Sequence, residues 1–256
     1  MTSKSLLNGT SAAERLIVAL DFNSAAEANR LIGQLEGTVN FYKVGWQLFL
    51  GEGWPFVGAL LKDGRSVFLD LKINDIDQTV QAALANMPDD FAGRLELLTI
   101  SGNSATVNAA KRGRGASDKP YLLMLTVLSS MDASDLEELA TGGAAPDTDS
   151  VVRHRAQQAL DAGCEGLIAS GSSVSGLRRE FPDRDFLIVS PGIRPSASGH
   201  DDHKRTLTPY QAIASGSDYL VVGRPITRAA DPLQAAQAII SDMQAAVDEA
   251  SGAIIQ

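Results

Sequence analysis

Two oppositely charged side chains, Asp70 and Lys72, stand two residues apart within the largely apolar segment FLDLKINDIDQTV. Side chains two apart on a β-strand leave the same face, so this carboxylate and ammonium are expected side by side. Lys43 lies at the end of the preceding predicted strand, in NFYKVG, and Asp75 follows Lys72 by three residues. The four charges sum to zero, and such an alternating quartet can be held in a partly buried site where a single charge could not. Taken without the other two charges, Asp70 and Lys72 fit an ion pair exposed to solvent at the end of a strand as well as they fit a functional site.

Two further motifs near the C-terminus could bind a phosphate. SPGIRP (190–195) and VVGRPIT (221–227) each follow or continue an apolar segment. Gly223 lets backbone amides approach an anion closely, and Arg224 can hold the anion with paired hydrogen bonds. In an α/β barrel, the loops after the seventh and eighth strands frequently form a phosphate site. The place of Gly-Arg-Pro after the last predicted strand therefore favours an anion site over an ordinary turn.

One segment has the composition of a metal site and contains His200, Asp201, Asp202 and His203. It is a Gly/Ser-rich loop without visible supporting residues, so a loop that gates an anion is favoured and no metal is expected. The sequence has no G-x-S-x-G, no P-loop and no G-x-G-x-x-G after a strand. Hydrolase, kinase and dinucleotide-binding functions therefore have no support.

Eight short apolar segments alternate with helical stretches along the chain. Several are nearly continuous apolar runs, as expected of parallel strands covered on both faces. The predicted strands are Leu16–Phe22, Val39–Val44, Ser66–Lys72, Leu95–Ile100, Tyr121–Leu128, Gly166–Ser170, Phe186–Ser190 and Tyr219–Val222. Eight β-then-α units predict an α/β fold, the closed (β/α)₈ TIM barrel, with an open doubly wound sheet as the alternative. We expect a single domain over 15–256, preceded by an N-terminal tail over 1–14.

The composition of the 256 residues excludes several classes of protein. Apolar residues make up 44% and charged residues 21%, which argues against a disordered or fibrous chain. The net charge of −9 predicts repulsion of nucleic acid and of anionic membranes, so neither is expected as a partner. Cys164 is the single cysteine, and no apolar run has the length of a membrane span or of a signal-peptide core. These features predict a cytoplasmic protein with Cys164 in its core.

Six motifs, in the family's order, resemble those of the orotidine 5′-phosphate decarboxylase family. They are ALDF (19–22), FYKVG (41–45), FLDLKINDI (68–76), LTVLSSM (125–131), SPGIRP (190–195) and DYLVVGRPIT (218–227). The resemblance runs from about Leu16 to Pro232, and the combination of D-x-K-x-x-D-I with PGIRP and GRPIT is highly specific. It implies decarboxylation of orotidine 5′-phosphate to uridine 5′-phosphate and carbon dioxide, the last step of de novo pyrimidine synthesis, without a cofactor.

The resemblance also implies a catalytic set made of Lys43, Asp70, Lys72 and Asp75. Lys43 would bridge the ribose and the charged network, while Asp70 would lie against the substrate carboxylate. Lys72 would donate the proton that replaces carbon dioxide. The implied assembly is a homodimer, in which Asp75 and Thr79 reach the substrate of the other subunit.

The remaining implied contacts are with the ribose, the base and the phosphate of the substrate. Asp21 would bind a ribose hydroxyl and Ser129 would read the pyrimidine edge, while Gly223 and Arg224 would hold the phosphate. The full set of implied substrate-binding residues beyond the catalytic four is Asp21, Ile76, Thr79, Ser129, Pro191, Arg194, His203, Gly223 and Arg224.

The chain departs from the family pattern in three places. An aromatic or aliphatic residue and then His are common where Ile73 and Asn74 stand, and His is common at the end of the fourth strand, where Thr99 stands. The loop that usually reads Asp-Gln-Lys-Arg has His203 in place of the Gln that bridges base and phosphate. These departures leave open a barrel that binds nucleotides without turnover.

A second alternative is a magnesium-dependent decarboxylase or aldolase of the same superfamily, acting on a sugar phosphate. Those relatives share the D-x-K-x-x-D element but place an acidic metal ligand one strand earlier. The corresponding strand here ends in Lys43, so this alternative has little support.

Overall fold

The computed structural model describes residues 7, 10–88, 91, 94–128, 130–131, 133–139, 147–171, 173–195 and 207–252. Eight parallel strands close into one barrel in the order β1 to β8, each paired with its neighbours in sequence and β8 with β1. The strands are β1 Leu16–Ala19, β2 Phe41–Gly45, β3 Ser66–Ile73, β4 Leu97–Ile100, β5 Tyr121–Leu125, β6 Gly166–Ile168, β7 Leu187–Ser190 and β8 Tyr219–Val222. Every strand predicted from the sequence is confirmed, with ends that shift by a few residues.

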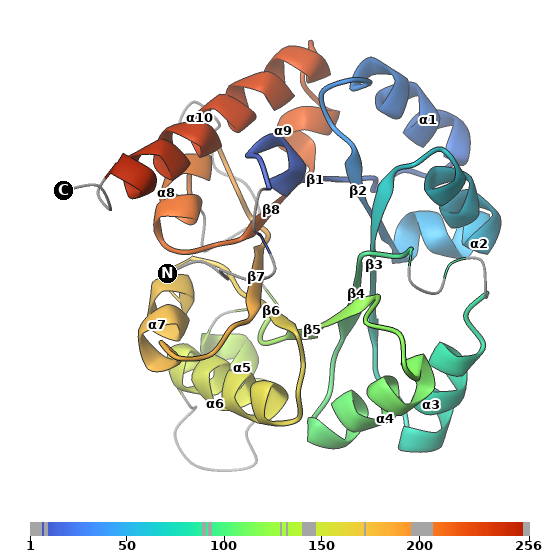
Figure 1. The fold of residues 1–256 in the computed structure, drawn as a ribbon, viewed down its shortest axis with the longest axis vertical. Helices are drawn as coiled ribbons and strands as arrows, with labels where there is room; N and C mark the ends of the chain where they lie inside the picture. The colour runs from blue at the N-terminus through green and yellow to red at the C-terminus, as the bar shows by residue number, and fades with distance from the viewer. Residues whose placement is uncertain are drawn as a thin grey trace.

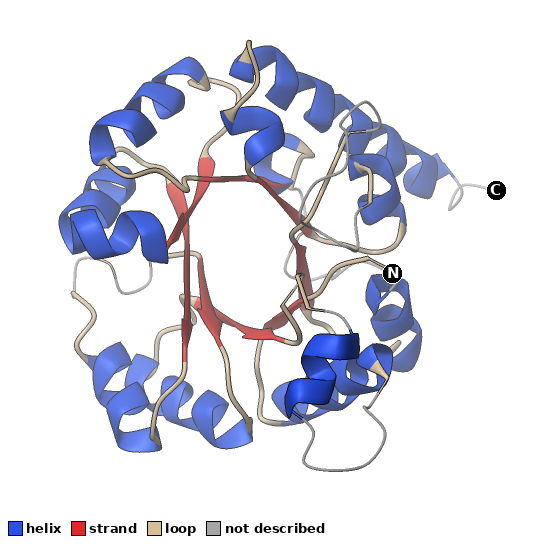
Figure 2. Cartoon of the chain, turned by 180° about the vertical axis from the view of Figure 1, so that it is seen from behind, coloured by secondary structure: helices blue, strands red, loops and turns tan. Residues whose placement is uncertain are grey.

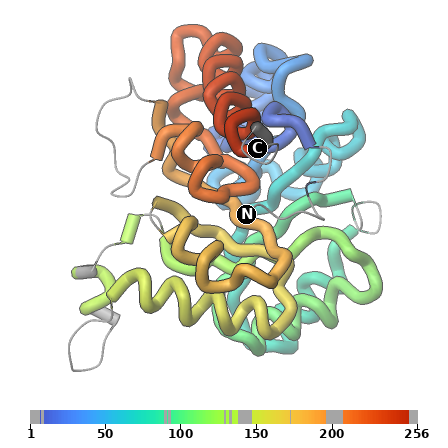
Figure 3. The backbone as a smooth tube through the Cα atoms, turned by 60° about the vertical axis from the view of Figure 1, so that its left-hand side comes forward, coloured from blue at the N-terminus to red at the C-terminus, as the bar shows by residue number. Residues whose placement is uncertain are grey.

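A ring of helices encloses the barrel (Figures 1 and 2). The helices are α1 Ala25–Gln34, α2 Trp46–Lys62, α3 Asp77–Ala85, α4 Ser104–Arg114, α5 Ala133–Leu139, α6 Thr148–Asp161, α7 Ser173–Glu180, α8 Pro209–Ala214, α9 Arg224–Thr227 and α10 Pro232–Gly252, and a 3₁₀ turn, η1 Ala13–Arg15, precedes β1. Figure 3 shows that α10 returns beside α1, which completes the ring. The TIM barrel predicted from the alternation of segments is therefore confirmed, and the open sheet is wrong.

The apolar runs of the strands are explained by two separate layers of core. Side chains that point inward, such as Ile17, Phe68 and Leu123, form a small cluster inside the barrel. Their neighbours in sequence, such as Leu16, Leu69 and Leu122, point outward and pack against the helices in a larger cluster. Because both faces of each strand are covered, alternation in hydrophobicity is lost and a continuous apolar run results.

Two smaller predictions are also tested by the structure. Cys164 is buried, 5% exposed, and its Sγ donates to the carbonyl of Leu122, so its predicted place in the core is confirmed. No helix within the described residues is both long and apolar enough to cross a membrane.

Candidate active site

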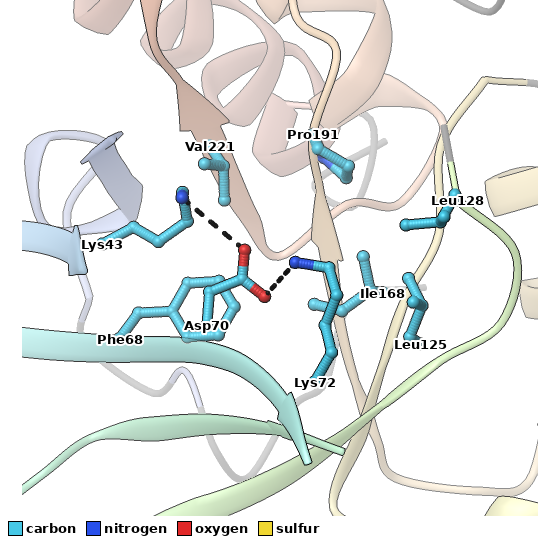
Figure 4. Close-up of a pocket in the computed structure, with 9 residues that line it drawn as sticks. All are labelled: Lys43, Phe68, Asp70, Lys72, Leu125, Leu128, Ile168, Pro191 and Val221. Atoms are coloured by element: carbon cyan, nitrogen blue, oxygen red, sulfur yellow. Dashed lines mark hydrogen bonds and ion pairs between the residues drawn. The ribbon is translucent and has the colours of Figure 1, made fainter. Parts of the chain in front are cut away.

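A cavity of about 180 Å³ lies inside the barrel at the carboxyl ends of the strands (Figure 4). It is lined by Lys43, Phe68, Asp70, Lys72, Leu125, Leu128, Ile168, Pro191 and Val221. Three of these side chains are charged and the other six are apolar. The motifs in the sequence identify the charged residues and Pro191, whereas the apolar lining is recognised only when the strands are closed into a barrel.

The charged residues form one connected network. Lys72 Nζ donates to Asp70 Oδ1 at 2.8 Å, and Lys43 Nζ lies 3.6 Å from Asp70 Oδ2. Lys43 Nζ also donates to Asp21 Oδ1 at 2.9 Å. The network therefore runs Asp21, Lys43, Asp70, Lys72 with alternating charge, and Figure 4 shows Asp70 between the two ammonium groups. The prediction that Lys43 partners Asp70 is confirmed.

The network sustains the ionised form of Asp70, whose side chain is 15% exposed. Burial alone would raise the pKa of Asp70. The charges of Lys43 and Lys72, with hydrogen bonds from Lys72 and Thr99, outweigh burial and hold that pKa below its usual range. A carboxylate is thus fixed in the cavity at neutral pH, beside the ammonium group of Lys72.

An irregularity in β3 aims Lys72 at Asp70. The register between β3 and β4 shifts between Leu69 and Ile73, and Lys72 has a φ of 48°, a left-handed conformation that is unfavourable for a residue with a long side chain. Strained backbone of this kind is typical of functional sites.

Thr99 of β4 hydrogen-bonds to both Asp70 and Lys72 and is completely buried. Its hydroxyl donates to Asp70 Oδ1 at 2.8 Å and accepts from the backbone amide of Lys72 at 3.0 Å. The sequence identifies Thr99 only as a departure from a family pattern. The signal for its role is a hydroxyl side chain on the inward face of an apolar strand, one strand away from Asp70.

Gly45 leaves space beside the ammonium group of Lys43. A Cβ on Gly45 would lie 2.9 Å from Lys43 Nζ and 3.6 Å from Asp21 Oδ1, too close for the ammonium to stay in place. The glycine that ends FYKVG therefore leaves room for the ion pair between Lys43 and Asp21.

The predicted residues of the β3–α3 segment stay outside the cavity. Asp75 accepts from the amide of Ile76 at 2.6 Å and forms no ion pair within the described part of the chain. Ile76 is 69% exposed and Thr79 is also exposed. Asp75 and Thr79 instead border a second cavity of about 410 Å³, which is also lined by Lys72 and by residues of α2 such as Trp46. The structure of one chain thus does not bring these three residues to Asp70.

The predicted phosphate residues follow strands that end at the cavity. Pro191 lines it directly, and Arg194 lies three residues further on. Gly223 and Arg224 follow the final residue of β8, whose Val221 lines the cavity. An added Cβ on Gly223 would make only an ordinary contact with Ala19, at 3.7 Å, so packing inside the protein does not require this glycine.

Two predicted residues, Ser129 and His203, lie outside the described residues, as do His200, Asp201 and Asp202. Among the residues that are described, no group of three or more His, Cys, Asp or Glu side chains could hold a metal ion.

Comparisons with known proteins agree with the fold and the motifs. Residues 14–239 match the model of the family described as orotidine 5′-phosphate decarboxylase / HUMPS. The chain is 43% identical over 232 residues to a protein named orotidine 5′-phosphate decarboxylase from Nitrobacter winogradskyi, covering 91% of this chain and 93% of that protein. It is 44% identical over 234 residues to one of the same name from Bradyrhizobium sp., with 91% and 93% coverage.

A solved structure shares the architecture as well. The crystal structure of orotidine 5′-phosphate decarboxylase from Lactobacillus acidophilus superposes with a TM-score of 0.75 and 32% sequence identity, covering 90% of this chain and 99% of that chain. On the family match, the sequence identity and this superposition, the chain belongs to the orotidine 5′-phosphate decarboxylase / HUMPS family.

Proposed function

We propose that this protein converts orotidine 5′-phosphate to uridine 5′-phosphate and carbon dioxide, the last step of de novo pyrimidine synthesis, without a cofactor. One observation carries the proposal: a carboxylate, Asp70, is fixed between the ammonium groups of Lys43 and Lys72 inside a largely apolar cavity. The names of the relatives agree with this activity.

The reaction breaks the bond between C6 of the pyrimidine and its carboxylate. The electron pair of that bond stays on C6, carbon dioxide leaves, and C6 then takes a proton from the ammonium of Lys72. The resulting amine recovers a proton from solvent. An ammonium held beside C6 in an apolar cavity stabilises the developing negative charge far more than it would in water.

Asp70 has two roles in this scheme. It fixes Lys72 through their 2.8 Å hydrogen bond, and it places a negative charge beside the carboxylate of the bound substrate. Repulsion between the two carboxylates is relieved as carbon dioxide departs, which favours the transition state over the bound substrate. Before substrate binds, the positive charge of Lys43 stabilises the ionised carboxylate of Asp70. Lys43 is itself positioned by its ion pair with Asp21.

The phosphate group would bind at the loops after β7 and β8. Arg224 supplies a guanidinium for paired hydrogen bonds, and the amide of Gly223 can approach the phosphate. Pro191 and Arg194 lie on the neighbouring loop, and His203 is assigned to the same region from the sequence. Binding energy from this distant group can then be used to assemble the site around the base. Ser129 is the residue assigned to the edge of the base.

The active unit would be a homodimer that uses the face formed by α2 and the start of α3. Three large apolar side chains on this face are exposed: Trp46 by 47%, Leu50 by 76% and Ile76 by 69%. Exposed apolar groups of this size mark interaction surfaces. Asp75 and Thr79 lie on the same face, so docking of two copies would carry them toward the substrate of the other subunit. Such docking would bring Asp75 of one subunit to Lys43, Asp70 and Lys72 of the other, which a single chain does not do.

Two further assignments stay as predicted from the sequence. We infer one catalytic domain over 15–256 after a tail over 1–14, and a cytoplasmic location, which rests on the single buried cysteine and on the enzymatic role.

A spectroscopic assay tests the proposed activity. Orotidine 5′-phosphate is mixed with the protein in the presence of EDTA, and the loss of its ultraviolet absorbance is followed. Turnover that EDTA does not change is expected. Activity that EDTA abolishes would favour the magnesium-dependent alternative, and binding of uridine 5′-phosphate without any turnover would favour a non-catalytic barrel.

A further inference from the structure

Arg155, near the middle of α6, is a partly buried cation that the proposed reaction does not use. Its Nη2 donates to the carbonyl of Leu125 at 3.2 Å and lies 3.9 Å from Met124 Sδ. Its Nε is buried and has no hydrogen-bond partner in the described part of the chain. Within the residues that the structure describes, Nη1 makes no hydrogen bond and no carboxylate forms an ion pair with this guanidinium.

Two other arginines with buried side chains have a carboxylate partner, which Arg155 lacks within the described part of the chain. The side chains of Arg114 and Arg178 are 9% and 8% exposed, and each forms an ion pair with a carboxylate, Glu165 and Asp218 respectively. At Arg155, burial lowers the pKa, and no charged group among the described residues offsets this effect. Because a guanidinium stays protonated in proteins, this part of the molecule holds a positive charge that the described residues do not neutralise.

This guanidinium borders a cavity of about 260 Å³, here called the side cavity. Its lining residues are Ser101, Leu125, Thr126, Val127, Leu128, Met131, Leu136, Val151 and Arg155. The lining is thus one cation, two hydroxyl groups and six apolar side chains. Leu125 and Leu128 also line the cavity that contains Asp70 and Lys72, so the two cavities share a wall.

We propose that the side cavity binds a small monocarboxylate, whose carboxylate pairs with Arg155 and whose short aliphatic chain contacts the apolar lining. Carboxylates match a guanidinium with paired, charge-assisted hydrogen bonds. A single negative charge balances the single cation, whereas a phosphate dianion would stay half neutralised in an apolar surrounding. The hydrocarbon chain is favoured because it removes apolar surface from water.

Binding of butyrate tests this site, and 1-butanol and inorganic phosphate are the matched probes. Isothermal titration of the intact protein with each probe gives the affinities, and saturation-transfer NMR identifies which part of butyrate touches protein. Butyrate is expected to bind, while 1-butanol lacks the charge and phosphate lacks the chain, so both should bind at least about tenfold more weakly. Equal affinity for butyrate and either control probe would overturn the proposal.

Variants then assign the binding to Arg155. Arg155→Met keeps the length of the side chain without its charge and should weaken butyrate binding about tenfold or more. Arg153→Met removes a cation from an exposed position of the same helix and should leave the affinity unchanged. If Arg155→Met fails to fold, Arg155→Lys serves instead, because it keeps the charge but not the paired geometry and should weaken binding by a smaller factor. Wild-type affinity in the Arg155 variant that folds would sink the assignment. No part of this test uses orotidine 5′-phosphate, so it stands or fails independently of the proposed function.

Discussion

The two ends of the barrel hold charged groups in opposite ways. At the carboxyl end, Asp70 and Lys72 face a cavity and pair with each other, and Asp70 also contacts Lys43 and Thr99. At the amino end, Asp218 directly precedes β8 and is completely buried. Its carboxylate is bound by groups of the protein itself: Arg178 forms an ion pair with it, and the amide of Ile188 donates to it at 2.6 Å. Arg15 donates to its backbone carbonyl at 2.7 Å.

The same arrangement recurs two strands away at the amino end. Glu165 directly precedes β6, accepts from Arg114 at 2.8 Å and accepts from the amide of Leu122 in β5 at 2.9 Å. Asp218 precedes β8 and accepts from the amide of Ile188 in β7. In both cases the carboxylate joins the preceding strand to an arginine from a helix, and neither lines any of the cavities described above.

The difference shows how one fold separates stability from chemistry. The carboxylates at the amino end accept from backbone amides and arginines, so they connect neighbouring strands. Neither of them lines a described cavity where a ligand could bind. Asp70 accepts hydrogen bonds from Lys72 and Thr99 and forms an ion pair with Lys43, and the cavity beside it leaves space for a substrate. Substitutions at the carboxyl end should therefore change rates, whereas those at the amino end should change the free energy of unfolding.

Removal of the proposed proton donor should give the largest effect. Lys72→Ala should lower kcat by at least about 10³-fold, because it removes both the proton and the charge beside C6. The midpoint of thermal unfolding should change little. Steady-state kinetics and calorimetry on this variant and on Lys62→Ala, an exposed control, check both statements. Decarboxylation by Lys72→Ala near the wild-type rate would contradict the role of Lys72.

The converse effect is expected at the amino end. Arg178→Met should lower the free energy of unfolding by about 3–5 kcal/mol, because it leaves the carboxylate of Asp218 buried without its cation. The kcat of the folded protein should stay the same. Urea unfolding compares it with Arg179→Met, at an exposed neighbouring position. A stability loss no larger than that of Arg179→Met would show that the amino end is not locked as described.

The sequence predicts the carboxyl end well and the amino end poorly, for a physical reason. Asp70, Lys72 and Lys43 are polar residues within apolar strands, and the alternation of side chains along one strand suffices to bring Asp70 and Lys72 together. The pair of Arg178 and Asp218 joins residues 40 apart in sequence, and its partners are mainly backbone groups, so no local spacing reveals it. The contacts of Thr99 are intermediate in how well the sequence predicts them. They depend on the register between β3 and β4 and on the left-handed backbone conformation of Lys72.

Phosphate binding should depend on the loop after β8 by a smaller amount. Arg224→Ala should lower kcat/KM by roughly 10- to 100-fold, the usual worth of hydrogen bonds to a charged group, with most of the effect in KM. Arg228→Ala, an exposed position four residues later, is the control. The competitive inhibition constants of uridine 5′-phosphate and of uridine separate the phosphate contribution. If Arg224→Ala weakens both ligands equally, the phosphate is bound elsewhere.

The smallest effect is expected at Thr99. Its hydroxyl is buried and, like the carboxylates at the amino end, is bound to groups of the protein that the structure describes. Thr99→Val keeps the shape of the side chain but removes the donor to Asp70 and the acceptor for the Lys72 amide. Loss of one such hydrogen-bonding group costs about 1–2 kcal/mol, so kcat should fall roughly 5- to 30-fold while KM changes little. Thr99→Ser retains the hydroxyl and should restore most of the rate.

The pH profile distinguishes positioning from a general loss of packing at Thr99. The hydrogen bond from Thr99 helps to hold the pKa of Asp70 below its usual range, so its removal must raise that pKa. A rate that requires ionised Asp70 is lost as pH falls through this pKa, and the acid limb of kcat/KM should therefore move to higher pH in Thr99→Val but not in Thr99→Ser. An unmoved acid limb with a lowered melting temperature would instead place Thr99 with Asp218 and Glu165, among the groups that hold strands together without taking part in the reaction.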